Sequence, residues 1–342
     1  MTRIRILRAG LSTTVQDRGR THLRHLGVPV GGAMDLLSHD LANRLVGNLI
    51  DAATLEMTLT GDEIEFPDDT LIAITGADMQ PGMSHADGRR LALAQHCPIV
   101  VRSGGHIRFQ AARRGCRCYV AIAGGINVPV VLGSRSTLLR AALGGHCGRI
   151  LAAGDELVTG DVLGPSQSLI KTLIHVAPPS SEVLQPHWLV RPEELPHSDI
   201  ATLRIVPGSH ASWLTKAEWK NIHDIDFVVS SQSDRMGFRL TGHQLTIPQR
   251  EELQSEGVAP GTIQVPPDGN PILLMADCAP TGGYPRIGHV ITADLGIAAQ
   301  MRPGQSVRFV AVTMEQAQTL VRQQRNRLNT SILGMQLALG MI

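Results

Sequence analysis

The sequence predicts an all-β protein with two similar domains and a few helices. Short apolar segments rich in β-branched residues recur between Gly and Pro turns, for example 71–74, 119–122 and 271–275. This spacing is typical of sandwiches and barrels rather than of alternating strands and helices. The length of 342 residues suits about two domains. The third observation is an internal repeat.

Matching residues recur in the same order about 200 positions further along the chain. The matches pair Arg5-Ile6-Leu7 and Gly10 with Arg204-Ile205-Val206 and Gly208, Glu56 with Glu256, Gly61 with Gly261, Asp78 with Asp277, and Arg108-Phe109 with Arg308-Phe309. A duplication explains such a series, and clefts between domains are favoured places for ligand sites. We therefore predict that 3–109 and 202–309 share one topology.

The first domain is predicted over 1–165 and includes a Gly-rich insertion over 113–164. A Pro-rich segment, 166–201, is expected to connect it to a second domain over 202–312. Residues 34–46 have apolar side chains at helical spacing, and Asp35 is placed to cap the start of that helix. The remainder, 313–342, is expected to form a C-terminal helix.

Composition excludes several classes of protein. The net charge of +1 gives no electrostatic basis for binding nucleic acid or an acidic membrane surface. No apolar run reaches the roughly 18 residues of a membrane span, and the N-terminus lacks the apolar core of a signal peptide. The five cysteines follow no disulfide or zinc pattern, which predicts a cytoplasmic protein without a metal site.

Acidic residues in Gly-rich turns are the first candidates for chemistry. We expect Asp17, Asp35 and Glu256 to be catalytic, because a carboxylate in such a turn can act as a general base, and Asp234 to bind substrate nitrogens. The alternative role of all four is capping of turns and helices. Tyr284, one of two tyrosines, follows Gly282-Gly283 and is the fourth catalytic candidate.

Other polar residues in these turns are candidates for substrate binding. Arg135 lies between two serines and suits a carboxylate or phosphate, although a structural pair with an acid is equally consistent. The remaining binding candidates are Ser136, Gln264, Gly282 and Gly283. Gly-rich turns can present backbone N–H groups to an anion, or can be tight turns only. We expect the candidates of both halves to converge on one pocket lined by the turns at Gly124 and Gly282.

Ten segments, in preserved order and spacing from about residue 3 to 310, carry a resemblance to a known family. They are 15–20, 31–35, 42–48, 75–78, 123–126, 131–137, 233–237, 255–257, 263–269 and 281–285. The sequence resembles the allophanate hydrolase subunit 2 family, whose free-standing members are often described as biotin-dependent carboxyltransferases. The family includes the C subunit of bacterial ATP-dependent 5-oxoprolinase and the carboxyltransferase domain of urea carboxylase.

The resemblance implies two cyclophilin-like β-barrels in tandem. It also implies ring opening of 5-oxoproline to glutamate, at the expense of ATP, together with companion A and B subunits. Two alternatives stay open: carboxyl transfer from carboxybiotin to urea or a similar amide, and a non-catalytic regulator that binds a partner resembling the B subunit. One departure bears on the substrate, since Ala279-Pro280-Thr281 stands where the family usually has Gln-Thr-Thr.

Two absences limit what the chain does alone. The sequence contains no Gly-Lys-Ser/Thr and therefore no Walker A loop. None of its lysines, Lys171, Lys216 and Lys220, has the Met-Lys-Met context of a biotin carrier. We expect ATP to be used with the partner subunits, and biotin not to be attached to this chain.

Overall fold

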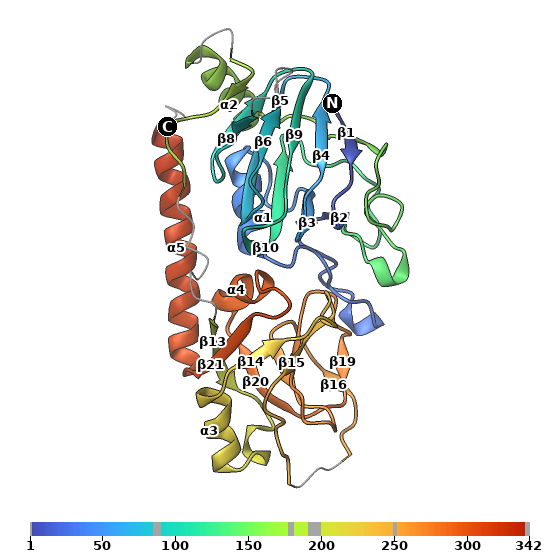
Figure 1. The fold of residues 1–342 in the computed structure, drawn as a ribbon, viewed down its shortest axis with the longest axis vertical. Coiled ribbons are helices and arrows are strands. Elements are labelled where there is room, and N and C mark those ends of the chain that lie inside the picture. The colour runs from blue at the N-terminus through green and yellow to red at the C-terminus, as the bar shows by residue number, and fades with distance from the viewer. Residues whose placement is uncertain (1, 85–89, 177–180, 191–199, 249–251, 339–342) are drawn as a thin grey trace. The chain divides into compact units, whose positions relative to one another are not determined.

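The computed structural model describes residues 2–84, 90–176, 181–190, 200–248 and 252–338. The chain forms two compact units. Unit 1 comprises Met1–Gly19, Asp35–Glu193 and Arg327–Ile342, and unit 2 comprises Arg20–Met34 and Glu194–Asn326. Both units are rich in strands and contain few helices, which confirms the predicted all-β class (Figure 1).

Unit 1 is built on two six-stranded sheets. One has the order β11-β1-β4-β9-β6-β7, formed by Glu156–Val158, Arg3–Arg8, Glu63–Phe66, Gly105–Arg108, Gly82–Ser84 and Arg90–Ala92. The other has the order β12-β8-β5-β10-β3-β2, formed by Val183–Leu184, Pro98–Val101, Thr70–Asp78, Arg114–Ile122, Thr54–Thr58 and Ser12–Gln16. Alternate apolar residues of these strands form the unit's core, including Ile4, Ile64, Ile72, Ile107 and Val120.

Helix α1 (Leu36–Leu45) confirms the helix predicted over 34–46. Asp35 caps its start, because its carboxylate accepts the backbone N–H of Ser38 at 3.1 Å. Gly47 follows its end with a φ of 73°, a conformation that glycine adopts without strain. The helix lies against β10 (Figure 1), and the residues of that strand from Cys116 to Ile122 are buried on both faces.

Unit 2 contains a closed seven-stranded barrel of order β13-β20-β17-β18-β15-β14-β21. These strands are Ile200–Pro207, Arg286–Val290, Thr262–Gln264, Ile272–Leu274, Gly237–Thr241, Phe227–Val229 and Ser306–Ala311. Phe227 and Phe309 meet in its core with ring centroids 5.8 Å apart. A separate ribbon pairs β16 (Glu256–Gly257) with β19 (Thr281–Gly282). The unit also contains helices α3 (Lys216–Asp224) and α4 (Leu295–Ala299).

A segment from the N-terminal part of the chain, 20–34, packs with this barrel. Gly31 donates its backbone N–H to Ala276 O at 3.0 Å, and Arg235 Nη2 donates to Gly32 O at 2.5 Å. Met34 is 5% exposed within the barrel's core. The structure thus places 20–34 in unit 2 and not, as we had predicted from the sequence, in the first domain. The contacts that hold it there join residues far apart in sequence.

The segments outside the two predicted domains also have regular structure. Helix α2 (Gly164–Val176) and β12 occupy part of the segment 166–201, which we expected to be a connection. Helix α5 (Met314–Ala338) forms the predicted C-terminal helix. Its Asn329 accepts a hydrogen bond from Arg44 at 3.1 Å, and Ile332 and Met335 are buried. The end of α5 therefore belongs to unit 1.

The repeat is only partly reflected in the strand order. Gly10 and Gly208 both follow the first strand of their unit, and a Cβ on either would collide with a carbonyl oxygen of the neighbouring chain segment. Strands β4 and β9 are hydrogen-bonded neighbours, but their expected counterparts β17 and β21 are not neighbours in the barrel. The alignment of these strands from the repeat was wrong, because matched residue types do not fix strand pairing.

Within the described ranges, no helix is both long and apolar enough to cross a membrane. The same residues include no group of three or more His, Cys, Asp or Glu side chains that could hold a metal ion. All five cysteines are free thiols, and only Cys147 is exposed.

Candidate functional site

The buried carboxylate of Asp17 organises one side of unit 1. Asp17 directly follows β2 and is 7% exposed. It accepts hydrogen bonds from Ser134 Oγ at 2.6 Å, from the backbone N–H of Arg135 at 2.5 Å and from that of Gly19 at 2.8 Å. Ser136 Oγ donates a further short bond. One carboxylate therefore holds the turn 133–137 from a distant part of the chain.

These donors also set the charge of Asp17. Burial alone would raise the pKa of its carboxyl group, but the hydrogen bonds from Ser134, Ser136 and two backbone N–H groups bring the pKa below its usual value. The carboxylate is thus ionised at neutral pH and already has four donors. This arrangement favours the capping role that the sequence left open over that of a general base. The Asp17 carboxylate also accepts the backbone N–H of Arg135, one of the turn's N–H groups that we expected to bind an anionic ligand.

Two hydrogen bonds hold Arg135 in position. Its backbone N–H is held by Asp17, and its side-chain Nε donates to Val128 O at 3.1 Å. Among the described residues, neither Nη1 nor Nη2 of Arg135 has a hydrogen-bond or ion-pair partner. A guanidinium with two free nitrogens can hold a carboxylate in a bidentate geometry.

The Arg135 side chain lines a cavity of about 260 Å³ in unit 1. Polar lining comes from Asn48, Asp51, Asn127 and Asp161, and the wall includes Gly124, Gly125 and Gly160. Gly124 has a φ of 89°, and a Cβ at this position would collide with the backbone of Gly160. Glycine therefore allows two backbone segments to meet at the cavity wall.

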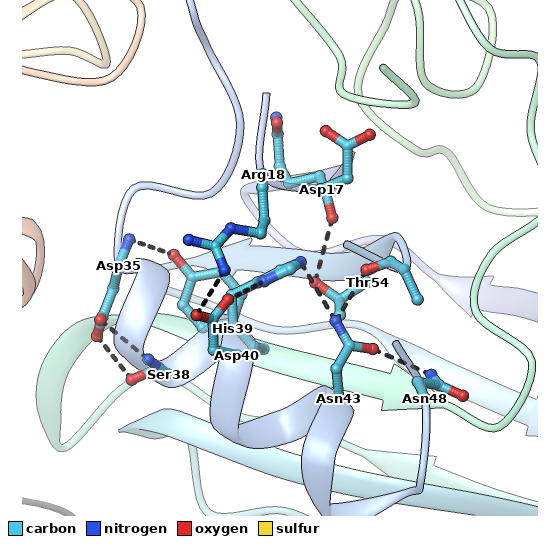
Figure 2. A network of polar contacts seen from close by, with 12 residues as sticks. Asp17, Arg18, Asp35, Ser38, His39, Asp40, Asn43, Asn48 and Thr54 are labelled. Carbon is cyan, nitrogen blue, oxygen red and sulfur yellow. Dashed lines mark hydrogen bonds and ion pairs between the residues drawn. The ribbon is translucent and has the colours of Figure 1, made fainter. Parts of the chain in front are cut away.

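Asn48 fixes that wall by donating and accepting hydrogen bonds, and Figure 2 shows its bond with Asn43. Its Oδ1 accepts the backbone N–H of Gly124 at 2.9 Å, and its Nδ2 donates to Ile122 O at 2.8 Å and to Asn43 Oδ1 at 3.0 Å. Asn43 in turn donates to Ala52 O at 2.8 Å. The geometry of the cavity is thereby tied to helix α1.

A buried histidine continues this network. His39 is fully buried, with Nδ1 3.3 Å from Asp40 Oδ1 and Nε2 3.4 Å from Asn43 Nδ2 (Figure 2). Because the Asn43 amide nitrogen is a donor, His39 Nε2 is the acceptor and Nδ1 carries the proton toward Asp40. Asp40 also pairs with Arg18 at 3.1 Å.

We did not select any of these network residues from the sequence. Two signals were present: His39 and Asn43 are four residues apart on one helical face, and Asn43 and Asn48 lie within the family-like segment 42–48.

Asp35 serves a different part of unit 1. Besides capping α1, its carboxylate accepts Ser38 Oγ at 2.6 Å, and its backbone N–H donates to the Tyr119 hydroxyl oxygen at 2.8 Å. The Tyr119 hydroxyl donates to Glu56 Oε2 at 2.7 Å. Burial and the neighbouring carboxylates raise the pKa of Tyr119 well above its usual value, so the phenol stays protonated. These contacts favour the capping role for Asp35.

Most second-half candidates lie together in unit 2. Glu256 is opposite Gly282 in the β16–β19 ribbon, and Gln264 Nε2 donates to Tyr284 O at 3.4 Å. A Cβ on Gly282 would lie 2.6 Å from Gln264 Nε2. Tyr284 is 44% exposed, and its hydroxyl has no protein partner within the described part of the chain. The structure brings Glu256, Gln264, Gly282, Gly283 and Tyr284 into one neighbourhood.

Glu256 and Asp234 both have partners. Arg286 forms an ion pair with Glu256 and lowers the pKa of its carboxyl group, first through the hydrogen bond and then through its charge. Asp234 lies in an exposed turn, where it accepts the backbone N–H groups of Met236 at 2.8 Å and Gly237 at 3.2 Å. That contact pattern is the capping alternative.

Unit 2 also has a cavity, of about 690 Å³, that the sequence did not reveal. Its lining includes Arg24 and His25 from the 20–34 segment, and Thr262, Thr281 and His289 from the strands. Pro280, where the sequence departs from its family's usual Gln-Thr-Thr, is also in the wall. The first-half candidates Asp17, Asp35, Arg135 and Ser136 lie in unit 1 and the others in unit 2. Their convergence on one pocket stays a prediction.

Comparison with known proteins identifies the class of this fold. The family described as "carboxyltransferase domain, subdomain A and B" matches residues 26–311, so the chain belongs to it. Among solved structures, it is similar to the Kluyveromyces lactis urea amidolyase with a TM-score of 0.81 and 27% identity. The match covers 96% of this chain but only 20% of the amidolyase.

Particular relatives are similar over nearly the whole chain. It is 37% identical to the C subunit of 5-oxoprolinase from Escherichia coli (strain K12) over 314 residues, which cover 92% of this chain and 93% of the relative. The corresponding protein of Haemophilus influenzae is 36% identical, covering 93% of this chain and 94% of the relative. The urea amidolyase of Lachancea kluyveri is 32% identical over 94% of this chain and 17% of its own length. The resemblance inferred from the sequence is confirmed.

The contacts of Asp17 generate a stability prediction. Asp17→Asn replaces an acceptor of four hydrogen bonds by an amide whose NH₂ faces donors. We expect it to lower the free energy of unfolding by roughly 2–4 kcal/mol at neutral pH. Asp234→Asn, in an exposed turn, should cost less than about 1 kcal/mol. Urea unfolding of both variants measures the difference.

The effect should depend on pH in a defined direction. The folded-state pKa of Asp17 lies below the unfolded value of about 3.9, so its contribution is complete above that pH and declines as the pH falls through the folded-state pKa. The gap between wild type and Asp17→Asn should narrow below about pH 4. If both variants lowered the free energy of unfolding equally at neutral pH, Asp17 would not be holding the turn 133–137.

Proposed function

We propose that this chain is the C subunit of an ATP-dependent 5-oxoprolinase, which opens the lactam of 5-oxoproline to give glutamate. The support is identity of 36–37% to two proteins of that name over nearly their full length. Sequences this similar over the whole of both chains share a fold and often a role, whereas fold alone would not indicate the substrate.

The geometric observation that carries the proposal is the Arg135 cavity. 5-Oxoproline is a small five-membered lactam with one carboxylate, and the cavity offers a guanidinium with two free nitrogens beside polar side chains in about 260 Å³. In this proposal Arg135 binds the substrate carboxylate. The Asn127 amide donates to the lactam carbonyl oxygen, and the carboxylate of Asp51 or Asp161 accepts the single lactam N–H. Asp17 acts as a positioning residue through the 133–137 turn.

ATP and the partner chains belong to the assembled enzyme in this proposal. A lactam is an unreactive amide, and ATP supplies the driving force for opening it. The turn 133–137 does not suit a phosphate group, because the Asp17 carboxylate already occupies its donors. We therefore assign ATP to a site completed by homologues of the A and B subunits. That biotin is not attached to this chain and that the protein is cytoplasmic both stay predictions.

Carboxyl transfer is the second candidate function. It is favoured by the family description and by the similarity to urea amidolyases. In that reaction Arg135 would bind the carboxyl group that is transferred, and an amide such as urea would occupy the same cavity. The two functions differ in the required partner, which is a lactam-hydrolase complex in one case and a biotinylated chain in the other.

Reconstitution separates these functions. The purified chain alone should release no ADP with 5-oxoproline or urea, because it has neither a Walker A loop nor a biotinyl lysine. Adding the A and B subunits should give ADP release that depends on 5-oxoproline and not on urea. Turnover by the single chain would contradict its role as one component of a complex. Urea-dependent activity with a biotinylated partner would establish the carboxyltransferase instead.

Arg135→Lys tests the substrate anchor in the reconstituted enzyme. Lysine keeps the charge but loses the bidentate fork, so we expect the KM for 5-oxoproline to rise about tenfold or more, with a smaller change in kcat. The control is Arg140→Lys, an exposed arginine of the same chain region that does not line the cavity. An unchanged KM in Arg135→Lys would show that Arg135 does not bind the carboxylate of 5-oxoproline.

A further inference from the structure

The cavity of unit 2 has no role in the proposed function, and its construction indicates a ligand. It is about 690 Å³ in volume and shares no lining residue with the Arg135 cavity. Arg24 and His25 come from the 3₁₀ turn η1 (Arg24–Leu26), while Val258, Thr262 and His289 come from the barrel and the segment before β17. Two segments more than 200 residues apart in the chain therefore line the same cavity.

The turn that carries Arg24 is anchored to the barrel on its C-terminal side. Arg235 forms a bidentate ion pair with Asp277, with two N–O distances of 2.9 Å, and also donates to Gly32 O at 2.5 Å. Gly31 donates to Ala276 O at 3.0 Å. These bonds involve half-buried or buried groups, which are screened less by solvent than surface pairs. Arg24 is thus presented to the cavity by a fixed segment.

The charge of the lining is positive. The described residues that line it include one arginine and two histidines but no carboxylate. The acidic residues next to the lining segments are already paired, Glu256 with Arg286 and Asp277 with Arg235. Within the described residues, the side chain of Arg24 makes one long hydrogen bond, 3.5 Å, to Pro280 O, and His25 has no hydrogen-bond or ion-pair partner. An unpaired guanidinium in a hollow without acids favours an anion.

Neutral donors and an apolar wall complete the cavity. His289 Nδ1 lies 3.3 Å from Thr262 Oγ1, and burial lowers the pKa of this imidazole, so it is neutral at physiological pH and can donate or accept a hydrogen bond. Val258 and Pro280 supply apolar surface, and the backbone N–H of Val258 bonds Pro280 O at 2.9 Å. The hollow therefore offers a charged anchor, hydroxyl and imidazole groups, and an apolar face.

We propose that this cavity binds a small organic oxyanion, a carboxylate or a phosphate ester with an apolar body, through Arg24. His25 adds a second donor, and the apolar body lies against Val258 and Pro280. This site is additional to the Arg135 cavity, so the chain carries two anion sites of different size.

Direct binding tests the proposal without any turnover. The full chain with Arg135→Gln, which removes the anchor of the other cavity, is titrated calorimetrically with benzoate, phenyl phosphate and the neutral analogue benzamide. We expect saturable binding of benzoate or phenyl phosphate and at least tenfold weaker binding of benzamide. Which of the two anions binds more tightly distinguishes a carboxylate site from a phosphate site.

Variants then assign the site to Arg24. Arg24→Gln in the same background should weaken the bound anion at least tenfold, while Arg239→Gln, an exposed arginine on β15 outside the cavity, should leave it unchanged. Thermal melts confirm that both variants are folded. The proposal is overturned if neither anion binds saturably, if Arg24→Gln binds like its parent, or if both variants weaken binding equally. Each of these results leaves the assignment of 5-oxoproline to Arg135 intact.

Discussion

The carboxylate of Asp17 is the constraint on which the proposed site in unit 1 depends. It joins the end of β2 to the turn 133–137, which lies more than 100 residues later, and uses backbone and hydroxyl donors of that turn together. An ionised group buried with four donors is stable only if all of them stay in place. Arg135 therefore has a backbone held by Asp17 and a side chain held by Val128 O, and only its terminal nitrogens remain for a ligand.

The second unit uses an ion pair for a similar purpose. The Arg235–Asp277 pair and the Arg235 bond to Gly32 hold 20–34 on the barrel, so that Arg24 reaches a cavity of which the barrel supplies the rest. In both units a buried or half-buried charged group organises a loop, and an arginine nearby is left without a carboxylate partner in the described structure. Charges used for structure and charges available to ligands are thus carried by different residues.

The sequence predicted the all-β class, the helix capped by Asp35 and the family, because each depends on local patterns or on motifs in order. The sequence could not predict that Asp17 accepts hydrogen bonds from Ser134 and Ser136, or that 20–34 packs with the barrel of unit 2. Both features depend on contacts between residues more than 100 positions apart. The same limit explains the wrong repeat alignment for β17 and β21. Acidic residues in Gly-rich turns were expected to be catalytic or to bind substrate, yet Asp17, Asp35 and Asp234 all accept backbone N–H groups. The network of His39, Asn43 and Asn48 was overlooked because none of its members lies in such a turn.

In the proposed site of unit 1, Asp17 positions Arg135 as the anchor for a substrate carboxylate. The most direct measurement is the ¹⁵Nε NMR signal of Arg135, recorded with only this chain labelled in the assembled enzyme while 5-oxoproline is added. We expect one arginine signal to shift saturably and to be missing in Arg135→Lys, and we expect Asp17→Asn to need a higher 5-oxoproline concentration for the same shift. An identical response in Arg135→Lys, or no effect of Asp17→Asn, would contradict it.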